Sequence, residues 1–254
     1  MRWIVAAAFL ALPAAAAQLK PETNAAFDRY IRQTEEHLDA RKGQLWADES
    51  PNRAQRLRDG QLVVEPFHGK ALVSVKDGLI HDWIGGAFLP GVTLEQTLRL
   101  MQDYNRHKVY YRPEMVDSRI LSHEDHRYHV FMRLLKKQII TVVLDTEHAI
   151  QYETIEPKKW RSASRSTRIA EVQNAGRPDE KVLPAGTGQG FLWRLNSYWR
   201  FNEGDGGTWI ECRAISLTRD IPTGLGWLVE PVIKNLPRDS LQHTLEATRA
   251  ALQR

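Results

Sequence analysis

The sequence FLWRLNSYWRFNEGDGGTWIECRAISL, residues 191–217, is the most informative segment for working out the architecture of this chain. Apolar residues alternate with polar ones on both sides of a polar, glycine-containing break at residues 204–207. Alternation with a period of two predicts β-strands, and a short Gly-rich break between two such runs predicts a hairpin. We therefore predict two antiparallel strands, at residues 191–201 and 208–217.

The same pattern extends back along the chain. Turn residues, among them Asp77-Gly78, separate short β-prone runs, as in a meander of antiparallel strands. The further predicted strands are residues 62–64, 71–75, 79–89, 116–121, 127–135, 139–144, 149–154 and 160–172. The chain is therefore expected to be built around one curved antiparallel sheet.

Helices are predicted before and within this run of strands. Residues 22–42 place Phe27 and other apolar residues on one face and charged residues on the other, the pattern of an amphipathic helix. A second helix is expected to begin after Thr93, because Gln96 three residues later completes a capping box. The polar residues 48–59 are interpreted as a linker.

The C-terminal region is expected to form a long helix. Apolar residues recur at helical spacing from residue 223 to residue 252. Pro237 suits a first helical turn, whereas Pro231 is expected to kink or divide the helix. The predicted architecture is therefore strands and an internal helix, then a long meander, then a terminal helix.

This order of elements resembles the START-type helix-grip superfamily (SRPBCC), which includes lipid-transfer, polyketide cyclase-like and plant-allergen proteins. The resemblance covers residues 61–254 and is clearest in SYWRF at 197–201, TWIEC at 208–212 and TRDIP at 218–222. It implies an α+β fold, in which a curved antiparallel sheet grips the C-terminal helix and leaves a cavity for an apolar ligand. The helix and linker at residues 18–60 are an addition to that pattern.

Composition limits the classes of protein that the chain can belong to. Of its 254 residues, 42% are hydrophobic and 26% are charged, which excludes a disordered chain, a collagen-like rod and a polytopic membrane protein. The net charge of +4 is small and spread along the chain, so no nucleic-acid partner is expected. Cys212 is the only cysteine, so an internal disulfide is excluded, and it is interpreted as a small buried residue.

The first 17 residues have the pattern of a secretory signal peptide. Arg2 precedes an apolar run at residues 3–12, and small residues ending at Ala17 follow. The apolar run has about half the length that a membrane-spanning helix needs. We expect cleavage after Ala17 and a periplasmic or secreted protein.

The hairpin also predicts which residues line a ligand cavity. If Phe201 lies opposite Trp209, alternation places a mostly apolar set on one face, which we assign to the concave side. The predicted ligand-binding residues are Trp193, Leu195, Ser197, Trp199, Phe201, Trp209, Glu211, Arg213 and Ile215. A shift of one residue in the pairing would change this assignment.

Glu211 and Arg213 have two interpretations on such a face. They orient the polar group of a ligand, with Glu211 as a weak candidate for a catalytic acid or base, or they form structural pairs with neighbours. Charges in an apolar setting need a partner in either case.

Three other groups of residues were considered. His123, His126 and His129 lie in a turn entering a strand, where three imidazoles would not converge on a metal. Neither a metal nor a cofactor is therefore expected. The alternating Ser162, Ser164 and Ser166 form either a hydrogen-bonding wall for a ligand or an exposed strand face, of which the exposed face is favoured. Arginines at 161, 165 and 168 are candidates for peripheral contact with a membrane.

Three functions follow as hypotheses. The first is an exported protein that binds or carries a hydrophobic small molecule, such as a lipid or an isoprenoid-like compound. The second is a cyclase- or hydrolase-type enzyme that uses Glu211. The third is a structural or partner-binding envelope protein in which the N-terminal helix is the docking element. The absence of a recognisable catalytic motif favours the first, and the oligomeric state stays open.

Overall fold

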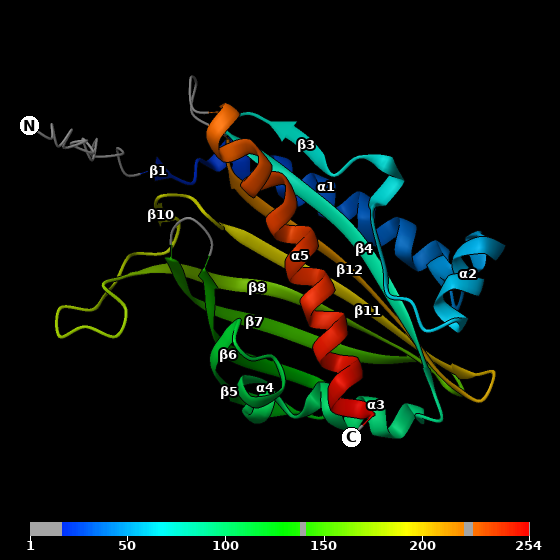
Figure 1. The fold of residues 1–254 in the computed structure, drawn as a ribbon. Coiled ribbons are helices and arrows are strands. Elements are labelled where there is room, and N and C mark those ends of the chain that lie inside the picture. The colour runs from blue at the N-terminus through cyan, green and yellow to red at the C-terminus, as the bar shows by residue number, and fades with distance from the viewer. Residues whose placement is uncertain (1–16, 138–140, 221–225, 254) are drawn as a thin grey trace, which may run out of the picture.

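A ten-stranded antiparallel sheet forms the centre of the computed structural model (Figure 1). The structure describes residues 17–137, 141–220 and 226–253, without the side chains of residue 68 and residues 226–234. The strands and α-helices are β1 (Ala17–Gln18), α1 (Pro21–Ala40), α2 (Pro51–Arg58), β2 (Val63–Pro66), β3 (Leu72–Val75), β4 (Gly78–Pro90), α3 (Leu94–Gln102), α4 (His107–Tyr110), β5 (Met115–Glu124), β6 (Arg127–Lys137), β7 (Thr141–Glu156), β8 (Lys159–Gln173), β9 (Lys181–Val182), β10 (Thr187–Gly188), β11 (Arg194–Gly204), β12 (Gly207–Arg219) and α5 (Gly226–Leu252). Short 3-10 helices occupy Trp46–Glu49, Phe67–Gly69 and Tyr104–Arg106.

The strand order explains which segments meet. Eight strands pair in the order β2-β4-β12-β11-β8-β7-β6-β5, while β3 pairs with β4 and β9 pairs with β8. The predicted hairpin is the β11–β12 pair, and it lies inside the sheet between β8 and β4. Helices can therefore pack against both faces of this hairpin.

Helices cover both faces of the sheet (Figure 1). We call the face packed against α5 the inner face, and the face packed against α1 and α2 the outer face. On the inner face, Leu245 of α5 joins a core with Ile210 and Cys212 of β12. On the outer face, Phe27 of α1 packs with Leu217. The α+β helix-grip architecture predicted from the sequence is confirmed.

Local signals at two turns are also confirmed. Thr93 caps α3: its hydroxyl accepts from the Gln96 N–H at 3.2 Å, and the Gln96 side chain accepts from the Thr93 N–H at 2.8 Å. Asp77 has a φ of 58°, as the predicted turn between β3 and β4 requires.

The interpretation of residues 48–59 as a linker is wrong. This segment contains part of the 3-10 helix Trp46–Glu49 and all of α2. Ser50 accepts a hydrogen bond from the Arg53 N–H at 3.4 Å, and Pro51 occupies the first turn. Leu57 fixes the helix on the outer face by joining a core with Trp209. The Ser-Pro pair is a helix-start signal that the surrounding arginines obscured.

Two further expectations about element boundaries are wrong. Residues 139–144 and 149–154, predicted as two strands, belong to the single long strand β7 where they are described. A division at Pro231 does not occur, since α5 is one helix from Gly226 to Leu252. Proline removes one backbone hydrogen bond from the helix. Packing of the C-terminal part of α5 against the sheet compensates for that loss.

Of the predicted signal peptide, residues 1–17, the structure describes only Ala17. Residues 1–16 lie outside the described part of the chain. Ala17 and Gln18 pair with Gly188 and Thr187 of β10. Within the described residues, no helix has the length and apolar character needed to cross a bilayer.

Candidate functional site

The β11–β12 register differs by one residue from the prediction. Phe201 lies opposite Ile210, and Trp209 lies opposite Asn202. The turn has two residues, Asp205 and Gly206, with φ values of 55° and 77°. Asp-Gly is the preferred pair for a two-residue hairpin turn with positive φ, whereas the predicted register implied a three-residue loop.

This shift divides the predicted ligand-binding set between the two faces. The four predicted residues on β11 lie on the inner face: Leu195, Ser197, Trp199 and Phe201. They pair with Ser216, Ala214, Cys212 and Ile210 of β12, in that order. The four predicted residues on β12 lie on the outer face, where Trp193 also packs with Phe27: Trp209, Glu211, Arg213 and Ile215. The assignment of all nine residues to one concave face is therefore wrong, because a one-residue slip turns a strand over.

At the α3 end, the inner face is filled by aromatic side chains. The rings of Trp199 and Phe201 stack with centroids 5.9 Å apart. The Tyr104 and Tyr152 hydroxyls lie 2.7 Å apart, and Tyr152 donates to the Met101 carbonyl at 3.1 Å. This end of the inner face is a packed core.

Hydroxyl and imidazole groups occupy the middle of the inner face. Ser162, Ser164 and Ser166 are buried there, so the favoured expectation of an exposed strand face is wrong. Ser164 Oγ lies 3.3 Å from His148 Nδ1. Burial lowers the pKa of His148 to about 4, so its imidazole is neutral at neutral pH. The serine row is therefore buried on the inner face, and its role as a hydrogen-bonding wall for a ligand stays a prediction.

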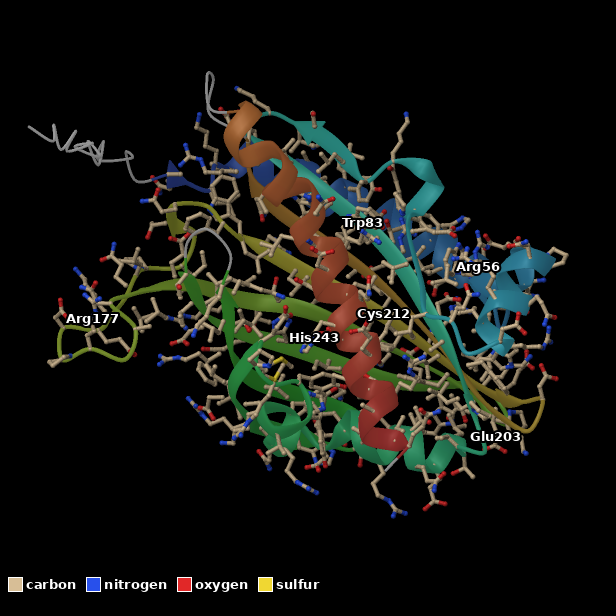
Figure 2. All side chains as sticks on the ribbon, viewed as in Figure 1. Arg56, Trp83, Arg177, Glu203, Cys212 and His243 are labelled. Carbon is tan, nitrogen blue, oxygen red and sulfur yellow. The ribbon has the colours of Figure 1, made fainter. Side chains whose placement is uncertain are left out.

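Trp83, labelled in Figure 2, lies two residues from His81 on β4, and alternation puts both on the inner face. His81 is fully buried, and burial lowers its pKa to about 4. Its Nε2 lies 3.0 Å from the Thr218 hydroxyl, but its Nδ1 has no partner among the described residues. The buried indole Nε1 of Trp83 also has none there. Unpartnered buried polar atoms are rare and mark places where another group can bind.

The contacts of Thr218 favour one tautomer of His81. The Thr218 hydroxyl lies within hydrogen-bond distance of the Arg219 carbonyl, at 3.1 Å. When it donates its proton there, its oxygen accepts from His81 and the His81 proton is on Nε2. In that tautomer His81 Nδ1 is an acceptor, on the same face of β4 as the N–H donor of Trp83. Apart from the alternation along β4, no feature of the sequence indicated this pair.

Glu211 is held in a structural ion pair on the outer face. Arg41 Nη1 lies 3.0 Å from Glu211 Oε1, and the Trp46 N–H donates to Glu211 Oε2. Burial raises the pKa of Glu211, and the positive charge of Arg41 opposes that shift. Arg213 binds the buried Asp82 in the same way. Of the two interpretations of Glu211 and Arg213, the geometry supports structural pairing.

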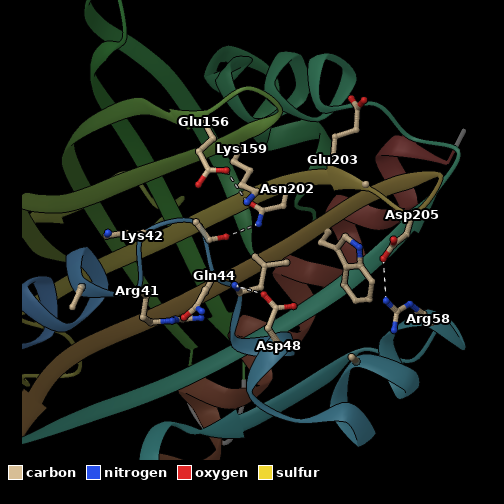
Figure 3. A pocket seen from close by; sticks show the side chains of 16 residues that line it. Arg41, Lys42, Gln44, Asp48, Arg58, Glu156, Lys159, Asn202, Glu203 and Asp205 are labelled. Carbon is tan, nitrogen blue, oxygen red and sulfur yellow. Dashed lines mark hydrogen bonds and ion pairs between the residues drawn. The ribbon is translucent and has the colours of Figure 1, made fainter.

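A cavity bordered by described residues lies on the outer face, at the ends of two hairpins (Figure 3). It has a volume of about 530 Å³. Its lining residues are Ala40, Arg41, Lys42, Gly43, Gln44, Leu45, Asp48, Ala54, Arg58, Glu156, Lys159, Asn202, Glu203, Gly204, Asp205 and Trp209. We call it the outer cavity; sequence reasoning did not anticipate it, because its walls come from four separate segments.

The remaining candidate residues have local partners. His123 stacks on Tyr128 with centroids 4.1 Å apart, whereas His129 Nε2 lies 3.4 Å from Glu147. No group of three or more potential metal ligands occurs among the described residues. Arg161 and Arg165 pair with acidic residues of α1. Membrane contact through these arginines stays a prediction.

Comparison with known proteins finds similarity in solved structures. No family model matches the chain, and no curated protein matches it. The STAR-related lipid transfer protein fragment from Xanthomonas axonopodis is 14% identical, with 73% of this chain and 100% of that chain covered and a TM-score of 0.48. The aromatase/cyclase Zhui from Streptomyces sp. R1128 is 11% identical, with 69% and 94% covered and a TM-score of 0.45. Human STARD10 is 10% identical, with 76% and 78% covered and a TM-score of 0.43.

Proposed function

We propose that this protein binds and carries an apolar molecule with a hydroxyl group, a lipid or isoprenoid alcohol, between the inner face of the sheet and α5. The observation that carries this proposal is the pair of unpartnered groups at His81 Nδ1 and Trp83 Nε1. Each buried polar atom left without a partner costs roughly 1–3 kcal/mol. A ligand that satisfies both atoms regains that free energy on binding.

A hydroxyl group is the simplest chemical match to this pair. Trp83 Nε1 can only donate, and His81 Nδ1 in its assigned tautomer can only accept. A hydroxyl both accepts and donates, so the same kind of group suits either atom. A carboxylate or a fully ionised phosphate has no proton to give to His81, and an ammonium has no lone pair for Trp83.

The rest of the inner face suits an uncharged, largely apolar molecule. Burial keeps the pKa of both His81 and His148 near 4, so these imidazoles carry no charge at neutral pH. Trp199 and Cys212 contribute apolar surface next to the serine row. The opposite wall includes residues 226–234 of α5, whose side chains lie outside the described part, so the predicted cavity between sheet and helix is bordered partly by undescribed residues.

We further propose that the protein acts outside the cytoplasm. The pattern of residues 1–17 supports export and cleavage after Ala17. N-terminal sequencing of the protein from the cell envelope or the medium tests this, with Gln18 as the expected first residue. An intact N-terminus on cytoplasmic protein would overturn the proposed location without affecting the ligand.

Native mass spectrometry of the protein purified from its own source tests the ligand. We expect an adduct that extracts into organic solvent and carries a hydroxyl group. Purified protein is then titrated with hexadecan-1-ol, hexadecanoate and hexadecane, and binding is followed by displacement of a fluorescent apolar dye. The alcohol is expected to bind most tightly, and failure of all three probes and of any adduct would remove the proposal.

Two matched variants locate the site. Trp83→Phe keeps an aromatic ring but removes the N–H, so affinity for hexadecan-1-ol should fall about tenfold while affinity for hexadecane is unchanged. Trp46→Phe makes the same change on the outer face and should leave both affinities unchanged. Equal effects of the two variants would contradict an inner-face site.

A further inference from the structure

We propose that the outer cavity is a second binding site, separate from the inner face, for an uncharged polyhydroxylated molecule of the size of a mono- or disaccharide. Its volume of about 530 Å³ lies within the range of roughly 300–1,000 Å³ typical of small-molecule sites. The N-terminal segment and the ends of two β-hairpins each supply part of its wall (Figure 3).

The wall formed by residues 40–45 is held in place by the sheet. The Arg200 guanidinium donates to the carbonyls of Leu38, Lys42 and Gln44. Asn202 Nδ2 donates to the Gly43 carbonyl at 2.9 Å. These bonds tie an irregular loop to β11, so the cavity is formed before any ligand binds.

Asn202 provides an unsatisfied acceptor in this cavity. The residue is only 9% exposed, and its buried Oδ1 has no hydrogen-bond partner among the described residues. The orientation of the amide is fixed, because the Gly43 carbonyl can only accept and so must face Nδ2. A ligand that reaches Asn202 Oδ1 must therefore present an O–H or N–H donor to it, which a carboxylate or a fully ionised phosphate lacks.

The charges around the cavity favour a neutral ligand. Four basic residues (Arg41, Lys42, Arg58 and Lys159) and four acidic ones (Asp48, Glu156, Glu203 and Asp205) line it. Arg58 pairs with Asp205 at 3.0 Å, and Lys159 pairs with Glu156 at 2.8 Å. An ion of either sign would meet repulsion as well as attraction.

Donors and acceptors are mixed along the wall. Lys42 and Gln44 have no side-chain partner among the described residues and can donate, while Asn202 and Asp48 can accept. A polyol, whose hydroxyls both donate and accept, complements such a wall. Trp209 packs on Phe88 with centroids 4.7 Å apart and has the Arg58 guanidinium 5.0 Å from its ring centroid, so only a small part of its indole borders the cavity.

Ligand-observed NMR on the full chain tests this inference. The probes are glucose, N-acetylglucosamine, maltose and cellobiose, with inorganic phosphate and glycine betaine as ionic alternatives. We expect at least one sugar to bind with a Kd in the millimolar range or tighter. No sugar binding, or tighter binding of phosphate or betaine than of any sugar, would overturn the saccharide assignment.

Variants on β11 give a matched control. Asn202→Ala should weaken sugar binding about tenfold by removing the acceptor. Asn196→Ala removes another buried asparagine with an unpartnered Oδ1 on the same strand, but Asn196 does not line the cavity, so binding should not change. Equal losses in both variants would contradict the site.

A third variant keeps the test decisive if Asn202→Ala does not fold. Ala54→Phe on α2 places a large side chain at the cavity wall without altering a hydrogen bond, and it should abolish sugar binding. Unchanged binding in a folded Ala54→Phe protein would overturn the location.

Discussion

The guanidinium of Arg213 binds both carboxylate oxygens of Asp82, at 2.9 and 2.6 Å, in the buried interface between the sheet and α1. From α1, Tyr30 donates to the same carboxylate at 2.7 Å. Helix α1, which precedes residues 61–254, is thus joined to the sheet by this hydrogen bond. The face of α1 that carries Tyr30 is therefore packed on the sheet, and the third hypothesis, in which the N-terminal helix is the docking element, stays a prediction for the rest of the helix.

Arg213→Leu should therefore destabilise the protein strongly. The change leaves the Asp82 carboxylate buried without its cation, which costs about 3–5 kcal/mol in comparable cases. Urea unfolding followed by circular dichroism measures the loss. Arg99→Leu, which breaks the exposed Arg99–Glu95 pair, is the control and should change the free energy of unfolding by less than about 1 kcal/mol. Similar values for the two variants would show that the buried pair contributes little.

The sequence was sufficient for the order of elements but not for the register of the last hairpin. Strand β12 is buried on both faces, so large residues such as Trp209 and Ile210 follow each other directly. Where both faces are covered, apolar alternation no longer identifies the inward side. The Asp205-Gly206 turn carried the information that decides the register.

The sequence does not predict which groups the buried charged residues of β12 pair with. Glu211 pairs with Arg41, which lies 170 positions earlier in the chain. That contact depends on α1 packing across the outer face, and the helix pattern alone does not say which face it covers. The inner-face pair of His81 and Trp83 had a local basis, because alternation along β4 places them together and places Asp82 on the other side.

Stability should fall as the pH decreases from about 6.5 to about 4. Burial lowers the pKa values of His81, His107 and His148 to about 4, against 6.5 for an unperturbed histidine. Between these values the unfolded chain binds more protons than the folded one, so the free energy of unfolding rises with pH. Each histidine contributes on the order of 3 kcal/mol that is present above pH 6.5 and lost progressively toward pH 4.

The slope of stability against pH identifies the groups responsible. His148→Gln should reduce the slope between pH 6.5 and 4, measured by urea unfolding at several pH values. Ser122→Ala, at an exposed position that does not titrate, is the control and should leave the slope unchanged. A parent protein whose stability does not change over this range would contradict burial of neutral imidazoles.

Cys212 should be unreactive in the folded protein. The residue is 2% exposed under α5, and burial raises the pKa of its thiol well above the usual value. Ellman's reagent at pH 8 is expected to label it only as fast as the protein unfolds, and to label one thiol per chain in urea. A Cys212→Ser/Ser122→Cys protein, with its thiol on an exposed stretch of β5, should react immediately. Rapid labelling of the parent protein would show that α5 opens from the sheet without global unfolding.

Gly85 of β4 lies close to Leu245 of α5. A Cβ atom there would lie 2.8 Å from Leu245 Cδ1 and 3.0 Å from the Val63 carbonyl oxygen. Gly85→Ala should therefore cost about 1–3 kcal/mol of stability through overpacking, measured as a shift of the urea midpoint. Gly204→Ala adds the same methyl group where no atom lies within 4 Å, so it should be nearly neutral. If the clash with α5 is the cause, Gly85→Ala combined with Leu245→Ala should lose less than the sum of the two single changes. If the two losses of stability were strictly additive, the strain would lie between β2 and β4 and not in the contact between α5 and β4.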